Sequence, residues 1–224
     1  MASLYRFLVS LLIAIWSISC SYAVEVEGFL NAAFGSHEAI VVDAIKKDFG
    51  ESQKIQFYPV DERTGTKTIE IKVPHFTPLD VPATISYILG YKCHCLIQVS
   101  VVWQLPQNIT PAQRNSALEN ISKLVTAYST KVWTDGSILL GRVSDEIKEG
   151  QTTNYIFFRG VASDSSAITV WGAPVIIVKN TSTTPADKDK AALTANIDKL
   201  QTLGVSYELN VKKPDLKRVH TQSF

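Results

Sequence analysis

The sequence predicts an α+β fold, with a mostly antiparallel sheet and about three helices packed on it. Two observations lead to this prediction. Some segments carry apolar residues every three or four positions, which is the period of a helix, whereas others alternate polar and apolar residues, which is the period of a strand. Because the strand-like segments follow one another with only short polar turns between them, the sheet is expected to be antiparallel.

The first helix is predicted to follow Ser36, which can cap it, and to end at Gly50. Its apolar residues recur at helical spacing and are Ile40, Val41, Ala44, Ile45 and Phe49. Short runs rich in β-branched and aromatic residues then predict strands between 54 and 73. Residues 74–82 contain three prolines and are predicted to form a loop, because proline has no N–H to donate to a strand ladder.

Two further strands are predicted over residues 83–89 and 96–103, joined as a hairpin by residues 90–95. The start of the second helix has the strongest local signal. Thr110 can cap it, Pro111 suits its first position, and Gln113 completes a capping box. Its predicted stripe facing the sheet consists of Leu118, Ile121, Val125, Tyr128 and Val132.

The second half of the chain predicts three more strands, a third helix and a final strand. The strands cover residues 137–143, 154–161 and 167–179. Thr184 and Pro185 predict the start of the third helix, which would end at Gly204 and bury Leu193, Ile197, Leu200 and Leu203. Residues 205–211 alternate as a strand, and the basic residues 213–224 are predicted to form a mobile tail.

Residues 1–23 are predicted to be a secretory signal peptide. Arg6 precedes an apolar run over 7–16, and small residues end the segment at Ala23. The run is shorter than the roughly 20 apolar residues that span a bilayer, so no transmembrane segment is expected in the mature chain. Residues 24–224 would then form a single domain, within which 24–107 and 108–212 are candidate similar halves.

An alternative interpretation of the leader is a bacterial lipoprotein signal with Cys20 as the lipidated residue. Small residues precede this cysteine, but the leucine expected three positions earlier is missing. Cleavage after Ala23 predicts a protein of the periplasm or a secreted protein. Lipidation of Cys20 would instead tether the domain to a membrane.

The charge balance argues against nucleic acid as a partner. The chain carries 22 Lys and Arg and 21 Asp and Glu, and loss of Arg6 with the leader leaves 21 of each sign. Affinity for nucleic acid depends on a net basic face that neutralises phosphates. Common nucleotide-binding, hydrolase and metalloprotease motifs are also missing from the sequence. No cofactor is predicted, and the leading hypothesis is a non-enzymatic binding or protein-interaction module.

One short cluster, Cys93-His94-Cys95, contains side chains that bind soft metals. Two thiolates and an imidazole could hold Cu(I) or Zn(II), or act in redox chemistry, with His75 as the nearest additional ligand in sequence. In an extended strand, however, His94 would point away from the two cysteines. A disulfide between Cys93 and Cys95, or an ordinary structural role, is therefore favoured over metal binding.

A third hypothesis is an envelope hydrolase with an unrecognised site. It requires a deep pocket that contains a perturbed carboxylate or one of the histidines His37, His75, His94 and His220. Three tryptophans could line a ligand groove, although packing in the core is the favoured role of Trp103, Trp133 and Trp171. The oligomeric state is not predicted.

Short motifs lie at residues 28–29, 34–36, 44–50 and 86–92, and residues 135–140 add a looser one. Together these segments resemble a family of uncharacterised exported bacterial proteins. Over residues 28–103, a helix that ends in Phe49-Gly50 and is followed by strands also looks like the helix-plus-sheet modules of BamE-like envelope lipoproteins, which serve in assembly and interaction. The resemblance implies a bacterial periplasmic setting, another envelope protein as partner, and no catalytic residues.

Overall fold

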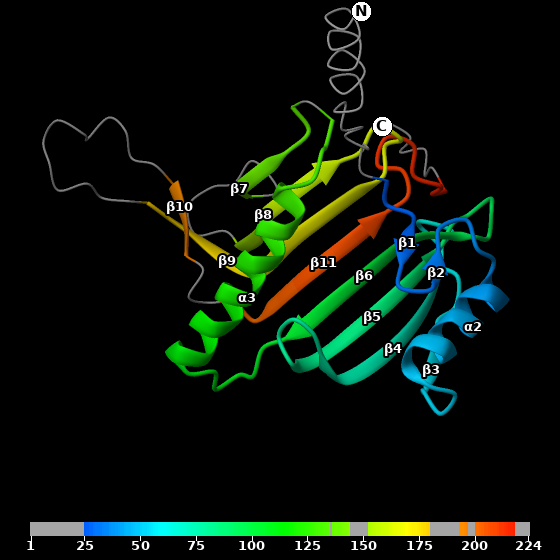
Figure 1. Cartoon of the computed structure of the whole chain (residues 1–224), viewed down its shortest axis with the longest axis horizontal. Coiled ribbons are helices and arrows are strands. Elements are labelled where there is room, and N and C mark those ends of the chain that lie inside the picture. The colour runs from blue at the N-terminus through cyan, green and yellow to red at the C-terminus, as the bar shows by residue number, and fades with distance from the viewer. Residues whose placement is uncertain (1–24, 135, 144–151, 180–192, 197–199, 218–224) are drawn as a thin grey trace, which may run out of the picture.

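The computed structural model describes residues 25–134, 136–143, 152–179, 193–196 and 200–217, and confirms the α+β class (Figure 1). Two helices, a large antiparallel sheet and a separate two-stranded sheet make up this part of the chain. The elements are β1 (Gly28–Phe29), β2 (Ala32–Ala33), α2 (Glu38–Phe49), β3 (Ile55–Phe57), β4 (Lys67–Phe76), β5 (Val81–Leu89), β6 (Leu96–Gln104), α3 (Pro111–Ser129), β7 (Leu139–Val143), β8 (Thr152–Val161), β9 (Ala167–Lys179), β10 (Leu193–Asn196) and β11 (Thr202–Glu208).

The last strand, β11, lies in the middle of the sheet. The strand order is β3-β4-β5-β6-β11-β9-β8-β7. The strand β11 pairs with residues 167–173 of β9, and β10 pairs with residues 176–179 of the same strand. Outward from the β6–β11 pair, the strands on each side follow in reverse chain order. The candidate halves 24–107 and 108–212 therefore share one sheet and meet at β6 and β11.

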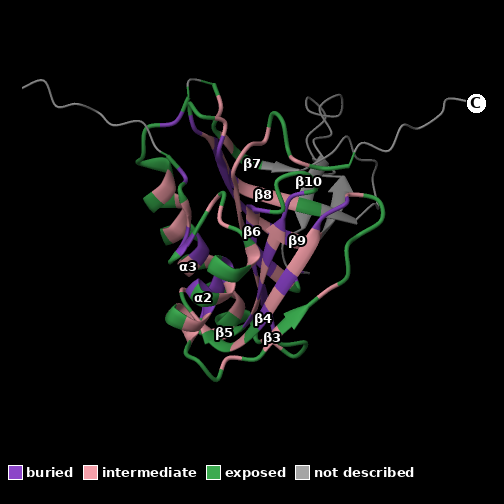
Figure 2. Ribbon diagram, turned by 90° about the vertical axis from the view of Figure 1, so that its right-hand side faces the viewer, coloured by how far each residue is buried: buried purple, intermediate pink, exposed green. Residues whose placement is uncertain are grey.

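The register aligns apolar residues in a row across the sheet. Successive neighbours in this row are Ile71, Ile85, Val101, Val205, Val170 and Phe158, and all of them are buried. Both helices lie on one face of the sheet (Figure 2). The alternation of the strands therefore places one apolar face beneath the helices, as the sequence pattern predicts.

The two helices begin differently. The capping box of α3 is confirmed, because the Thr110 hydroxyl accepts a hydrogen bond from the Gln113 N–H and the Gln113 side chain accepts one from the Thr110 N–H. The prediction that Ser36 caps the first helix is wrong, since His37 is the N-cap of α2. The Ser36 carbonyl instead accepts a hydrogen bond of 2.8 Å from Leu96 at the start of β6.

Two predicted segments differ from the structure. Only residues 77–80 of the predicted loop 74–82 lie outside strands, because β4 continues through an irregularity at Pro74 and β5 begins at Val81. The third helix is wrong over residues 193–196, which form β10, and from residue 202, where β11 begins. The rest of that prediction, 184–192 and 197–199, lies outside the described residues. The free end of β9 offers β10 a partner that local helical spacing does not reveal.

The face opposite the helices is largely polar. Cross-strand pairing aligns Ser86, Ser100, Ser206 and Thr169 on four adjacent strands. Trp171 lies half-buried on this face over Gly204, where an added Cβ would stand 2.5 Å from the indole ring. Trp103 and Trp133 are 2% and 7% exposed, so these two tryptophans pack in the core.

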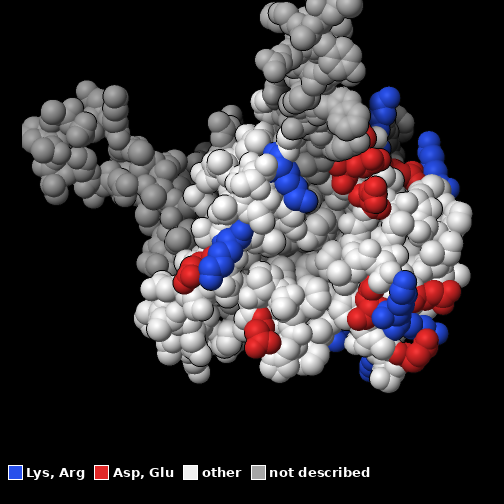
Figure 3. Space-filling model, viewed as in Figure 1, with Lys and Arg blue, Asp and Glu red and all other residues white. Residues whose placement is uncertain are grey.

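Charges of both signs are mixed on the helical face, with no extended patch of one sign in the part that Figure 3 colours. Many of them belong to α2, which carries Glu38, Asp43, Lys46, Lys47 and Asp48. Among the described residues, no helix has both the length and the apolar character needed to cross a bilayer.

Candidate functional site

The turn that joins β5 to β6, residues 90–95, holds the cysteine pair. Cys93 and Cys95 are joined by a disulfide, with their Cα atoms 5.0 Å apart. The turn is closed by a hydrogen bond of 2.8 Å from the Gly90 N–H to the Cys95 carbonyl. His94 between them has a φ of 50°, so the segment turns at this point instead of continuing as an extended strand. We call residues 90–95 the cystine turn.

The chain after β11 runs across the cystine turn. The sequence predicts a mobile tail from residue 213, but Asp215 is fixed by three hydrogen bonds. Its carbonyl accepts one from Tyr91, and its carboxylate accepts two, of 2.9 Å each, from the N–H groups of Lys92 and Cys93. Lys217 then donates to the Thr64 carbonyl. We call residues 209–217 the C-terminal strap; residues 218–224 lie outside the described part.

Gly90 makes this arrangement sterically possible. A Cβ atom at residue 90 would stand 2.5 Å from the Asp215 carboxylate and 3.0 Å from the Ile97 side chain. Contacts this short are strongly repulsive, so only glycine allows the strap to approach the cystine turn so closely. The glycine predicted from hairpin chemistry therefore also serves a tertiary contact.

A cavity of about 810 Å³ opens where the strap, the cystine turn and the end of the sheet meet. Its apolar wall is formed by Ile97, Leu209, Pro214, Leu216 and the disulfide. Polar and charged residues complete it and are Lys92, Gln98, Asp164, Glu208, Asn210, Lys213 and Asp215. A volume of this size with largely apolar walls is typical of small-molecule sites. We call it the strap cavity.

Glu208 is one of the charged residues that line the cavity. It ends β11 on the polar face of the sheet and is half-buried. Burial raises the pKa of the Glu208 carboxyl, because a desolvated carboxylate is less stable than a hydrated one, and Arg159 and Thr169 offset part of this effect. Among the described residues, the carboxylate has no ion-pair partner within 4.0 Å.

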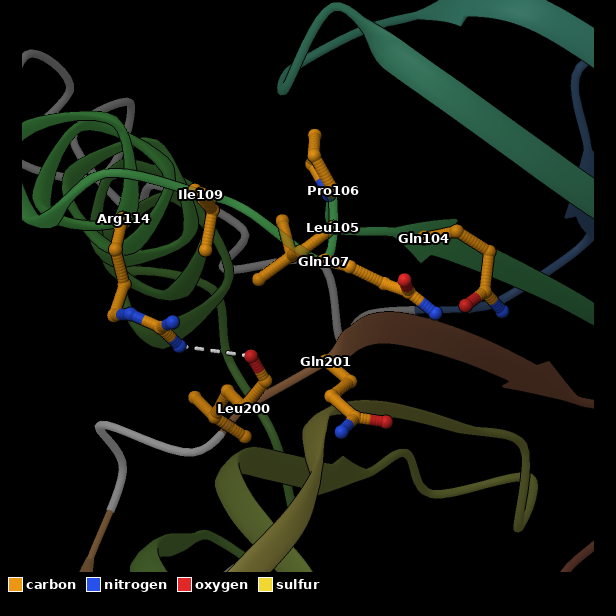
Figure 4. Close-up of a pocket in the computed structure, with 8 residues that line it drawn as sticks. All are labelled: Gln104, Leu105, Pro106, Gln107, Ile109, Arg114, Leu200 and Gln201. Carbon is orange, nitrogen blue, oxygen red and sulfur yellow. Dashed lines mark hydrogen bonds between the residues drawn. The ribbon is translucent and has the colours of Figure 1, made fainter.

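A second pocket lies at the opposite end of the β6–β11 pair (Figure 4). It measures about 450 Å³ and is lined by Gln104, Leu105, Pro106, Gln107, Ile109, Arg114, Leu200 and Gln201. The Arg114 guanidinium donates a hydrogen bond of 2.8 Å to the Leu200 carbonyl on one side, and the three glutamine carboxamides lie on the other. We call it the junction pocket, because it adjoins the link from β6 to α3.

The structure brings together only part of the predicted metal cluster. His75 lies near the β4–β5 turn, at the opposite end of β5 from the cystine turn, and faces Asp80. The histidine that lies next to the cystine turn is instead His37, whose backbone forms an isolated antiparallel β-bridge with Cys95. In the described part of the chain, no three His, Cys, Asp or Glu side chains are positioned to hold a metal ion. A disulfide offers no thiolate, so metal binding by Cys93, His94 and Cys95 stays a prediction for the reduced chain.

Sequence reasoning missed Glu208 and Asp215 as site residues. Glu208 occupies a polar position of a predicted strand, and Asp215 falls within the predicted tail. The sequence around Asp215 carries no local signal for the partners of this residue in the cystine turn, which lie more than a hundred residues earlier. His220, the fourth histidine of the hydrolase hypothesis, lies outside the described residues. Comparisons with family models, with curated proteins and with solved structures find no match to this chain.

Proposed function

We propose that this chain is an exported, non-enzymatic binding module and that the strap cavity is its ligand site. The observation that carries the proposal is the cavity of about 810 Å³ with a wall of aliphatic side chains. Burial of a ligand's apolar surface there would stabilise the complex by about 25 cal/mol per Å² before the costs of association. The junction pocket is a weaker candidate, because it is smaller and its three glutamine side chains are exposed.

Binding is tested with a fluorescent apolar probe, 1-N-phenylnaphthylamine, added to the purified full chain. We expect saturable fluorescence enhancement that Leu216→Ala weakens by about threefold to tenfold, because Leu216 forms part of the apolar wall. The matched control is Leu140→Ala on β7, since Leu140 is also exposed but lies outside the cavity. No enhancement, or an equal response of both variants, would show that the cavity is not the site.

Export is tested by the intact mass of the protein recovered from a bacterial host's envelope. A mass equal to residues 24–224 is the expected result and agrees with cleavage after Ala23. A lipid-bearing chain that begins at Cys20 would replace this with the membrane-tethered alternative. Recovery of residues 1–224 only in the cytoplasm would contradict export. The resemblance to envelope modules adds the expectation that another envelope protein is the physiological partner.

A second candidate function is thiol–disulfide exchange at the cystine turn. The observation that favours it is the exposure of Cys93, whose sulfur is joined to Cys95 at the edge of the cavity. A thiolate of a dithiol substrate would attack one sulfur and release the other as a thiolate. The second substrate thiol would then resolve the mixed disulfide, so that the dithiol is oxidised and the cystine is reduced to two thiols.

This candidate is tested by mixing the oxidised chain with dithiothreitol, followed by alkylation and mass analysis. Rapid formation of two alkylated cysteines, compared with an unstructured peptide of residues 88–97, would support redox activity. A rate no faster than that of the peptide would exclude it. The apolar-probe titration is independent of this result, because it measures ligand binding by the oxidised chain and not the rate of thiol exchange.

A further inference from the structure

The strap cavity contains charges of both signs, and their surroundings differ. Asp215 already accepts two backbone hydrogen bonds, and Asp164 accepts two from the N–H and the hydroxyl of Ser166. The two cations of the cavity, Lys92 and Lys213, are exposed to solvent. Water and salt screen exposed charges, so these lysines contribute little to ligand affinity.

Glu208 differs from the exposed Lys92, Asp164 and Lys213 because it is half-buried. It differs from Asp215, which is also half-buried, because no described backbone N–H donates to its carboxylate. Desolvation raises the pKa of this carboxyl, and Arg159 and Thr169 offset only part of the effect. Electrostatic attraction is stronger where water is excluded, so a cation placed in the cavity would interact more strongly with Glu208 than with the exposed Asp164. The cavity therefore has, beside its aliphatic wall, one half-buried carboxylate that no described backbone N–H neutralises.

We propose that the ligand of the strap cavity is a small amphiphile with an aliphatic body and a primary ammonium head, which pairs with the Glu208 carboxylate. The aliphatic body packs against Ile97, Leu209 and Leu216. This inference rests on the proposed function, since it names the ligand class of the same cavity. A half-buried carboxylate among the residues that line a cavity with apolar walls favours a cation with N–H donors over a neutral or an anionic head group.

The test is a calorimetric titration of the full chain with three ligands that share one alkyl chain: decylammonium, decanol and decyl sulfate, each below its micelle concentration. We expect decylammonium to bind about tenfold more tightly than decanol, and decyl sulfate to bind more weakly than decanol. Glu208→Gln is expected to remove the preference for decylammonium over decanol. The matched control is Glu119→Gln, which removes an exposed carboxylate of α3 that pairs with Lys123.

The outcomes separate the two proposals. Equal affinity for decylammonium and decanol, or tightest binding of decyl sulfate, would overturn the ammonium inference while leaving the cavity as a binding site. Binding of none of the three ligands would overturn the proposed function itself. An unchanged preference in Glu208→Gln would also overturn the inference. Should this variant fail to fold, the ranking of the three ligands by the unmodified chain still decides.

Discussion

The two ends of the central β6–β11 strand pair differ in the segment that follows each strand and in the cavity beside it. Seven residue pairs join the strands, from Gln98–Glu208 at one end to Gln104–Thr202 at the other, with Val101–Val205 in the middle. At the Gln104 end the chain continues into α3 and leaves a small pocket lined by carboxamides. At the Glu208 end it continues as an irregular strap and leaves a larger, more apolar cavity. The connecting segments at the strand ends, more than the paired strands, therefore determine where a site forms.

The difference also lies in how each end is held. At the junction end, the linker is fixed by the bond from Leu105 N–H to the Gln201 carbonyl and by Arg114. At the strap end, Asp215 binds the N–H groups of the cystine turn. A helix satisfies its own backbone, whereas a strap must find partners elsewhere. The comparison teaches that an irregular segment is held by hydrogen bonds to distant parts of the chain, among which the Asp215 carboxylate contributes two.

The largest expected effect compares the buried leucines at the two ends. Leu96 at the strap end and Leu200 at the junction end are 0% and 1% exposed. Leu96→Ala and Leu200→Ala should each lower the free energy of unfolding by about 2–5 kcal/mol, because each leaves a cavity in the core. Urea unfolding followed by tryptophan fluorescence measures both. A loss below about 1 kcal/mol for only one variant would show that its end is loosely packed.

A smaller effect is expected when the side-chain hydrogen bonds that hold each end are removed. Asp215→Ala removes two hydrogen bonds to a carboxylate and should lower the unfolding free energy by about 1–3 kcal/mol, with loss of probe binding. Arg114→Ala removes one bond to a carbonyl and should cost about 1 kcal/mol, with probe binding retained. Equal effects of both variants on probe binding would contradict the assignment of the site to the strap end.

The disulfide is expected to matter about as much as the carboxylate fastening. The double substitution Cys93→Ser and Cys95→Ser should lower the unfolding free energy by about 1–2 kcal/mol, because the loop that the disulfide closes is very short and constrains the unfolded chain little. Thermal unfolding under oxidising conditions measures the change, and the reduced natural chain is the control. A loss above about 4 kcal/mol would mean that the cystine supports much more than its own turn.

The smallest effect concerns Glu208 and pH. Its pKa is higher in the folded than in the unfolded chain, so its contribution to stability is fully present below the unfolded pKa and is lost as the pH rises through the folded pKa. Glu208→Gln, which cannot ionise, should therefore be more stable than the natural chain at neutral pH by less than about 1 kcal/mol. Melting curves measured from acidic to neutral pH should converge at the acidic end. A difference between the two proteins that grows toward acidic pH would contradict the raised pKa of Glu208 in the folded chain.

The parts of the fold that the sequence predicts well are those with strong local patterns. The alternation over 68–73 lies in β4, and the cap of α3 lies at Thr110, because these signals act between residues a few positions apart. The third helix is wrong because residues 193–196 pair with the open end of β9. Pairing of distant strands overrides a weak helical spacing.

For the candidate site, the sequence predicts the location of the cysteines in a hairpin turn and favours a disulfide or structural role. It predicts neither the strap nor the cavity, since Asp215 contacts Lys92 and Cys93 across more than a hundred residues. The His37–Cys95 bridge escapes prediction for the same reason. Nearness in sequence suggests a metal site with His75, but the length of β5 separates this histidine from the cystine turn.

The sequence by itself determined the class of the fold, the alternation that buries one face of β4, the start of α3 and the near-zero net charge of the chain. These properties arise from composition and from periods of two or three to four residues, which local sterics and burial impose. Only the tertiary structure decided that β11 lies beside β6, that Asp215 binds the cystine turn, and that Glu208 lines a cavity. Such contacts join residues that lie far apart in the sequence, and short-range sequence patterns do not specify which distant residues meet.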